Sequence, residues 1–123
     1  MLRNYRDLTA WQKAYQVCLD VYRISRKLPA SEKYGLTSQM RRAAVSVPSN
    51  IAEGYSRSST GDYIRGLRIA YASNSELETQ VMLARDLCYL SADDADKLLI
   101  SVQEVERILK ALTKSLARIQ AGP

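Results

Sequence analysis

The sequence predicts an all-α protein, an antiparallel up-down-up-down four-helix bundle that forms a single domain over residues 1–123. Three observations support this prediction. The chain has only 5 Gly and 3 Pro, which leaves few positions for turns and favours long helices over many short strands. Apolar residues recur at spacings of three and four in several separate stretches, the pattern of helices that bury one face. With 123 residues, 46% of them hydrophobic, the chain can bury a core without disulfides or metal.

The first helix is expected over residues 8–28, with Asp7 or Thr9 as its N-cap. A 3-4 rhythm predicts that its buried face consists of Leu8, Trp11, Tyr15, Cys18, Tyr22 and Ser25. Pro29 ends the helix because proline cannot continue it. Residues 29–33 then form a connection in which Ser31 is expected to cap the next helix.

The second helix is expected over residues 32–57 and contains Pro48, which removes one backbone hydrogen bond. We expect a continuous helix kinked at this proline. The alternative is a break followed by a restart, which Asn50 and Glu53 would cap. Together with Ser46, these two side chains are expected to bond across helices or to satisfy backbone groups that the proline frees.

The third helix is expected over residues 60–89, capped by Ser59 or Thr60, and the fourth over residues 92–119, capped by Ser91. The predicted core positions of the third helix are Tyr63, Leu67, Ala70, Asn74, Leu77, Val81, Ala84 and Cys88. Those of the fourth are Ala95, Leu98, Val102, Val105, Leu109, Leu112, Leu116 and Ile119. The polar member of the third set, Asn74, is expected to be hydrogen-bonded and to fix the register of the bundle.

The two middle helices are apolar on their outer sides as well as on their inner sides. In the second helix the inner stripe comprises Leu36, Met40, Ala43, Val47 and Ile51. A helix with two apolar faces needs a second partner, so self-assembly is the first functional inference. The expected oligomer interface comprises Val45, Ala52, Tyr55, Ile64, Tyr71 and Met82.

The whole chain has a net charge of +5, and the positive charge is concentrated in its first part. Residues 1–68 carry 12 Lys/Arg against 5 Asp/Glu, whereas residues 69–123 carry 6 against 8. This asymmetry favours a polyanion as partner, with a merely solvated charged surface as the alternative. The candidate nucleic-acid-binding residues are Arg41, Arg42, Arg57, Arg65 and Arg68. In an oligomer, repeated patches would contact several phosphates together.

Composition argues against an enzyme. The chain has no histidine, which removes the commonest general base and metal ligand, and no glycine-rich phosphate loop is present. We therefore expect no catalytic residue, no metal and no cofactor. Cys18 and Cys88 are expected to be reduced core thiols, with a disulfide or a reactive thiol as the alternative. Without a signal-peptide pattern or a long apolar run, we expect a cytoplasmic protein that does not enter a membrane.

Three segments resemble the 23S rRNA intervening-sequence protein family: residues 8–14 (LTAWQKA), residues 32–54, which end in SVPSNIAEG, and residues 75–80 (SELETQ). The resemblance covers nearly the whole chain. It implies an antiparallel four-helix bundle that assembles into a homopentameric ring and has no defined catalytic residues.

Some relatives in this family are encoded in insertions within ribosomal RNA genes. A similar family, the accessory proteins of diversity-generating retroelements, forms basic pentamers that associate with a reverse transcriptase and bind nucleic acid. The resemblance therefore implies RNA or DNA, and a reverse transcriptase or another nucleic-acid enzyme, as partners. The alternative is a protein-interaction scaffold without a nucleic-acid role.

Overall fold

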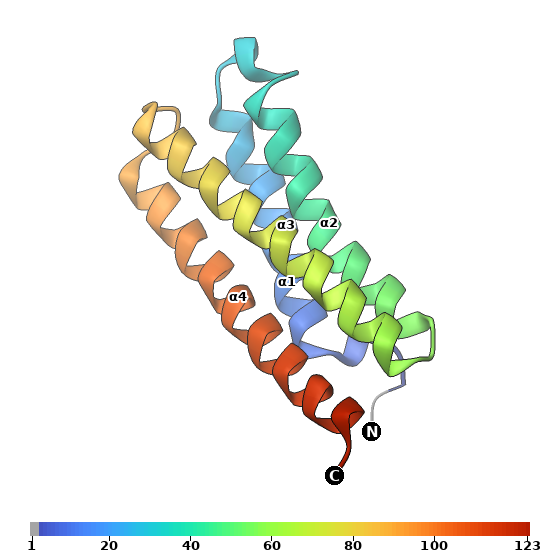
Figure 1. Cartoon of the computed structure of the whole chain (residues 1–123). Helices are drawn as coiled ribbons and strands as arrows, with labels where there is room; N and C mark the ends of the chain where they lie inside the picture. Colours follow the sequence, from blue (N-terminus) through green and yellow to red (C-terminus); the bar gives the residue numbers. More distant parts are fainter. Residues whose placement is uncertain (1–2) are drawn as a thin grey trace.

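The computed structural model describes residues 3–123 and confirms the all-α four-helix bundle (Figure 1). The helices are α1 (Thr9–Ile24), α2 (Leu36–Ser56), α3 (Thr60–Asp86) and α4 (Ala92–Ala121), and they alternate in direction. Helices α1 and α3 each pack against both α2 and α4. The α1–α2 side of the bundle therefore lies opposite the α3–α4 side, and both chain termini lie at one end.

The starts of α3 and α4 agree with the predicted capping. Ser59 Oγ accepts a hydrogen bond from the backbone N–H of Asp62 at 3.1 Å. Ser91 Oγ accepts one from the N–H of Asp94, also at 3.1 Å. Each hydroxyl satisfies one of the free N–H groups of a first helical turn, which explains why the chain turns into a helix there.

The starts of α1 and α2 differ from prediction. Leu8 occupies the N-cap of α1 without a side-chain hydrogen bond, and the Asp7 carboxylate accepts from the N–H of Arg3 instead. Helix α2 begins at Leu36 rather than residue 32, because the segment Ala30–Glu32 forms a 3-10 turn. The predicted Ser31 cap is therefore wrong; Glu32 Oε1 accepts from the N–H of Leu36 at 3.0 Å.

Helix α2 runs through Pro48 without interruption, so the alternative of a break and restart is wrong. The side chain of Asn50 donates to the backbone carbonyl of Ser46 at 2.8 Å and to its hydroxyl at 2.9 Å. That hydroxyl also bonds Ser73 Oγ of α3 at 2.8 Å, so part of the predicted cross-helix network exists. Glu53 does not take part, because its carboxylate pairs with Arg57 at 3.3 Å.

The core confirms most of the predicted inner stripes of α3 and α4, although Tyr63 is only half-buried and Cys88 is exposed. The α3 positions from Leu67 to Ala84 are buried, and the α4 stripe is buried as far as Leu109. Beyond this point Leu112 and Leu116 are half-buried against the core, and Ile119 is 68% exposed. Asn74 is 2% exposed and its Nδ2 donates to the Val102 carbonyl at 2.9 Å, so the predicted hydrogen bond is present and joins α3 to α4; its role in the register stays a prediction.

The predicted core face of α1 is only partly right: Leu8 and Ser25 are buried as predicted, Trp11 and Cys18 are half-buried, and the two tyrosines are exposed. Tyr15 and Tyr22 are 46% and 41% exposed. The residues of α1 that are buried instead are Ala10, Ala14, Val17, Val21 and Ile24. These small and branched side chains pack into the core, whereas the aromatic rings remain at the surface, where a tyrosine hydroxyl keeps contact with water.

The cysteines also differ from the expectation of core thiols. Cys18 is half-buried, and this burial raises the pKa of its thiol. Cys88 is exposed in the turn after α3, where its φ of 64° has taken the chain out of the helix. Both cysteines are free, so the disulfide alternative does not apply to this fold.

Two glycines set the close approach of α2 and α3. A Cβ added at Gly66 would lie 2.5 Å from the Asn50 carbonyl oxygen, and one at Gly54 would lie 3.0 Å from the Gly66 Cα. No side chain fits between the two backbones at this crossing. The crossing holds the end of α2 and the start of α3 rigidly together, and the arginines at positions 57 and 65 lie beside it.

Candidate nucleic-acid interface

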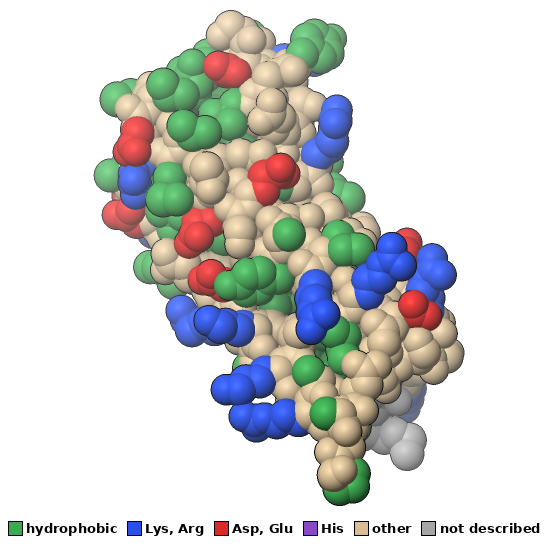
Figure 2. All heavy atoms as spheres, viewed as in Figure 1, with side chains coloured by type: hydrophobic (Ala, Val, Ile, Leu, Met, Phe, Trp, Pro, Cys, Tyr) green, Lys and Arg blue, Asp and Glu red, His purple; other side chains and the backbone are tan. Residues whose placement is uncertain are grey.

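Charge is separated along the length of the α3–α4 side. Because these helices are antiparallel, the start of α3 lies at the same end of the bundle as the end of α4 (Figure 1). Residues 57–68 and 107–118, here called the basic end, contain seven Lys/Arg and one Asp. Residues 76–106 contain eight Asp/Glu and two Lys/Arg. Figure 2 shows this division, with most basic side chains on the lower half of the view.

The basic end contains Arg57, Arg65, Arg68, Arg107, Lys110, Lys114 and Arg118. All seven side chains are exposed, and among the described residues only Arg57 forms an ion pair. Sequence reasoning selected the first three and missed the four of α4, because these lie in the chain half with negative net charge. These four cations could have been found from the sequence, because they recur along one helix with no carboxylate between them.

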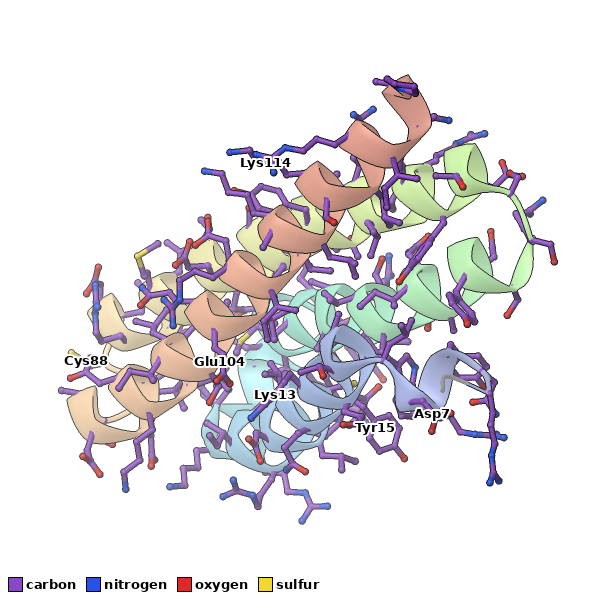
Figure 3. The ribbon with its side chains drawn as sticks, turned by 90° about the horizontal axis from the view of Figure 1, so that it is seen from below. Asp7, Lys13, Tyr15, Cys88, Glu104 and Lys114 are labelled. Carbon is purple, nitrogen blue, oxygen red and sulfur yellow. The ribbon has the colours of Figure 1, made fainter. Side chains whose placement is uncertain are left out.

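A hollow of about 390 Å³ lies between α3 and α4 at the basic end. We call it the basic groove, and its lining residues are Arg68, Tyr71, Lys110, Thr113, Lys114 and Ala117. Three of them are cations and none is a carboxylate. Figure 3 shows Lys114 projecting outward from α4, which leaves its ammonium group accessible to an anion.

Hydrogen bonds hold two polar side chains of the groove in place. The Tyr71 hydroxyl donates to Glu106 Oε2 at 3.3 Å, and the negative charge of this carboxylate raises the pKa of the tyrosine. Thr113 Oγ1 donates to the Leu109 carbonyl at 2.7 Å. The tyrosine therefore presents a positioned, neutral aromatic ring next to the cations.

A second hollow, of about 150 Å³, lies between α2 and α3 beside the glycine crossing. Arg57 and Arg65 line it, but so do the carboxylates of Glu53 and Asp62. The two acids offset the two arginines, so this hollow attracts anions less than the basic groove does.

The two remaining predicted arginines lie elsewhere. Arg41 donates to Ser25 Oγ at 2.9 Å and to the Tyr22 carbonyl at 3.3 Å, and its guanidinium lies 4.8 Å from the Tyr22 ring centroid. It ties the start of α2 to the end of α1. Arg42 is exposed but lies about 22 Å along α2 from Arg57, at 1.5 Å per residue. The five predicted arginines thus do not form one surface.

The predicted oligomer interface is also divided. Val45, which is 41% exposed, and the half-buried Ala52 line a hollow of about 340 Å³ between α1 and α2. Its other lining residues are Tyr5, Trp11, Tyr15, Cys18, Pro48 and Ser49. We call this surface the aromatic face; Trp11 stacks on Tyr15 with ring centroids 4.8 Å apart. Figure 3 shows Tyr15 pointing away from the bundle.

The other predicted interface residues do not join this face. Ile64 is only 4% exposed, so it offers almost no surface to a partner chain. Tyr55 packs edge-on against Tyr63 at 5.3 Å, and burial is the main reason that the pKa of Tyr63 rises to about 12. Tyr71 belongs to the basic groove, and Met82 is half-buried against the core. Trp11 and Tyr15 of α1, which were predicted to lie in the core, line the aromatic face instead.

These features define an all-α bundle protein with a basic end and an exposed aromatic face. Residues 6–111 match the family model described as 23S rRNA-intervening sequence protein, and the chain belongs to this family. A crystal structure of a protein of unknown function from the S23 ribosomal protein family of Bacteroides thetaiotaomicron is similar in fold. Its TM-score is 0.80 at 20% identity, with 86% of this chain and 99% of that chain covered.

A search of curated proteins finds no match to the chain. Within residues 3–123, no helix is both long and apolar enough to cross a membrane. In the same part of the chain, no cluster of three Cys, Asp or Glu side chains is placed to hold a metal ion. Neither the family description nor that of the similar structure names an enzymatic activity.

Proposed function

We propose that this protein is a non-enzymatic, homo-oligomeric, cytoplasmic protein that binds the phosphate backbone of RNA or DNA through its basic end. The observation that carries the proposal is that the two segments of the basic end contain seven cations and one carboxylate, and that six of the cations form no ion pair among the described residues. Most surface cations in proteins lie among acids that offset them. On the α3–α4 side most cations lie at one end, where a polyanion can neutralise several at once.

The aromatic face supports the oligomeric part of the proposal. We propose that a second copy of this chain covers it, and that the assembly is the pentamer which the family resemblance implies. Each added copy contributes another basic end and a net charge of +5. Several weak phosphate contacts then act together, which raises the overall affinity without any new kind of contact.

We propose further that the assembly serves as an accessory to a reverse transcriptase or another nucleic-acid enzyme. Phosphate contacts fix position on a nucleic acid but carry no base sequence information. Binding should therefore be insensitive to base sequence and should weaken steeply as salt rises.

The aromatic face also supports a second candidate function, a protein-interaction scaffold without a nucleic-acid role. Exposed aromatic rings rimmed by polar residues are typical of protein–protein contact sites. Titration of a labelled RNA at low and moderate salt separates the two functions. The proposal predicts binding at low salt that falls off as salt rises. If the RNA stays unbound even at low salt, the nucleic-acid-binding function is contradicted and the protein-interaction scaffold remains as the candidate function.

A further inference from the structure

We infer that the basic groove seats one unpaired nucleotide, so that the protein prefers single-stranded nucleic acid to duplex. The inference rests on the proposed function and deepens it by naming the form of strand that is bound. It depends on the pairing of an aromatic ring with three cations in a hollow between two helices.

The cations of the groove lack partners and repel one another. Lys110 and Lys114 are four residues apart on α4, a spacing at which like charges destabilise a helix. Arg68 faces the same hollow from α3. None of the three forms an ion pair within residues 3–123, and the nearby Glu106 accepts the Tyr71 hydroxyl. A bound phosphate would relieve this repulsion.

The rest of the lining suits a base rather than a second phosphate. The Tyr71 ring and the Ala117 methyl group contribute apolar surface, and the Thr113 hydroxyl adds a polar group. At about 390 Å³, the hollow is within the size range of small-molecule sites. Aromatic rings beside a cationic track are the usual means of binding single strands, because every base has a face that can stack.

A duplex cannot use the groove in this way, since its bases are paired and stacked inside the helix. Extruding a base from a duplex costs the free energy of unpairing and unstacking, and this cost is small for a base that is already single-stranded. The neighbouring hollow on α3 extends the track: Arg68 lines both hollows, and Arg65 lines the second, which contains no carboxylate. A strand lying across α3 can therefore place consecutive phosphates on these two arginines.

The test compares a short labelled RNA single strand with a duplex of the same length by fluorescence anisotropy at low salt. Three variants accompany the wild-type protein. Tyr71→Leu removes the ring, Tyr71→Phe keeps the ring but loses the bond to Glu106, and Ala117→Trp fills the hollow without removing a cation. Circular dichroism and thermal melting confirm that each variant is folded.

We expect the wild type to bind the single strand more tightly than the duplex. Tyr71→Leu and Ala117→Trp should each weaken single-strand binding on the order of tenfold, while Tyr71→Phe stays near the wild type. Equal affinity for both strand forms, or no effect of the Leu and Trp variants, overturns the inference and leaves the proposed function standing. If neither nucleic acid binds, the proposed function itself fails and takes the inference with it.

Discussion

The aromatic face and the basic groove lie on opposite sides of one bundle and have opposite chemistry. On the α1–α2 side, the exposed Tyr15 stacks on the half-buried Trp11, and no cation lines the hollow. On the α3–α4 side, three cations surround a single ring. The bundle core separates the two surfaces, so association of copies on one side leaves the other free for an anion. Changes that affect one surface alone therefore test whether the two are independent.

The largest expected effect comes from disturbing both surfaces at once through the glycine crossing. Gly66→Ala places a Cβ 2.5 Å from the Asn50 carbonyl oxygen, which forces α2 and α3 apart. Overpacking of this kind costs about 1–3 kcal/mol of unfolding free energy. We expect a fall of several degrees in the melting temperature, measured by circular dichroism.

Gly61→Ala is the matched control for this crossing. Its Cβ would meet only the Gln120 side chain, at 3.3 Å, and that side chain can move. Its melting temperature should stay at or slightly above that of the wild type, since alanine favours a helix over glycine. If Gly66→Ala has the same melting temperature as the wild type, the close glycine crossing is not needed to hold α2 and α3 together.

The next change is made in the aromatic face and is expected to alter both assembly and RNA binding. Val45→Glu puts a charge into the proposed contact between copies but none into the core. We expect the assembly to dissociate while helicity stays unchanged, as measured by light scattering and circular dichroism. RNA affinity should fall as well, because separate copies lose their joint phosphate contacts.

Ile100→Glu is the matched control for assembly. Ile100 is 66% exposed on α4 and lines neither surface. This variant should keep the mass of the wild-type assembly. If Val45→Glu keeps that mass too, the aromatic face is not the contact between copies.

The smallest effect concerns an ion pair that belongs to neither surface. Lys27 donates a hydrogen bond to the Asp94 carboxylate, which lowers the pKa of this aspartate in the folded protein. The pair therefore stabilises the fold above the ordinary aspartate pKa, and this contribution is lost as pH falls through the lowered value. We expect Asp94→Asn to melt slightly below the wild type at neutral pH and to differ less in acid. A gap that widens in acid would contradict this assignment.

The same contrast between the two sides explains what the sequence could predict. In α3 and α4 the 3-4 rhythm marks the core correctly, because small and aliphatic residues dominate it. In α1 the rhythm of Trp11, Tyr15 and Tyr22 competes with a second rhythm of alanine, valine and isoleucine. Large aromatic residues give the stronger periodic signal, but the small ones allow the helices to pack closely. Part of the outer face of α1 was thus predicted as core.

The basic groove was harder to find, since it requires two segments that are far apart in the sequence. Arg68 and Lys110 meet only because α3 and α4 are antiparallel, which composition by chain half cannot show. The engagement of Arg41 with the end of α1 depends on loop geometry that no periodic pattern encodes. Antiparallel pairing of the predicted helices would have brought residues 107–118 next to residues 60–68.

One comparison tests most directly whether the basic groove, rather than the overall charge, determines RNA binding. Lys110→Glu/Lys114→Glu reverses two cations of the basic groove, and Arg23→Glu/Arg26→Glu reverses two exposed cations at the far end of α1. Both double variants lower the net charge by the same amount. We predict that the groove variant loses RNA binding at low salt by tenfold or more, that the far-end variant stays near the wild type, and that both keep the wild-type assembly mass. Equal losses from the two variants would contradict the account, because overall charge and not this groove would then determine binding.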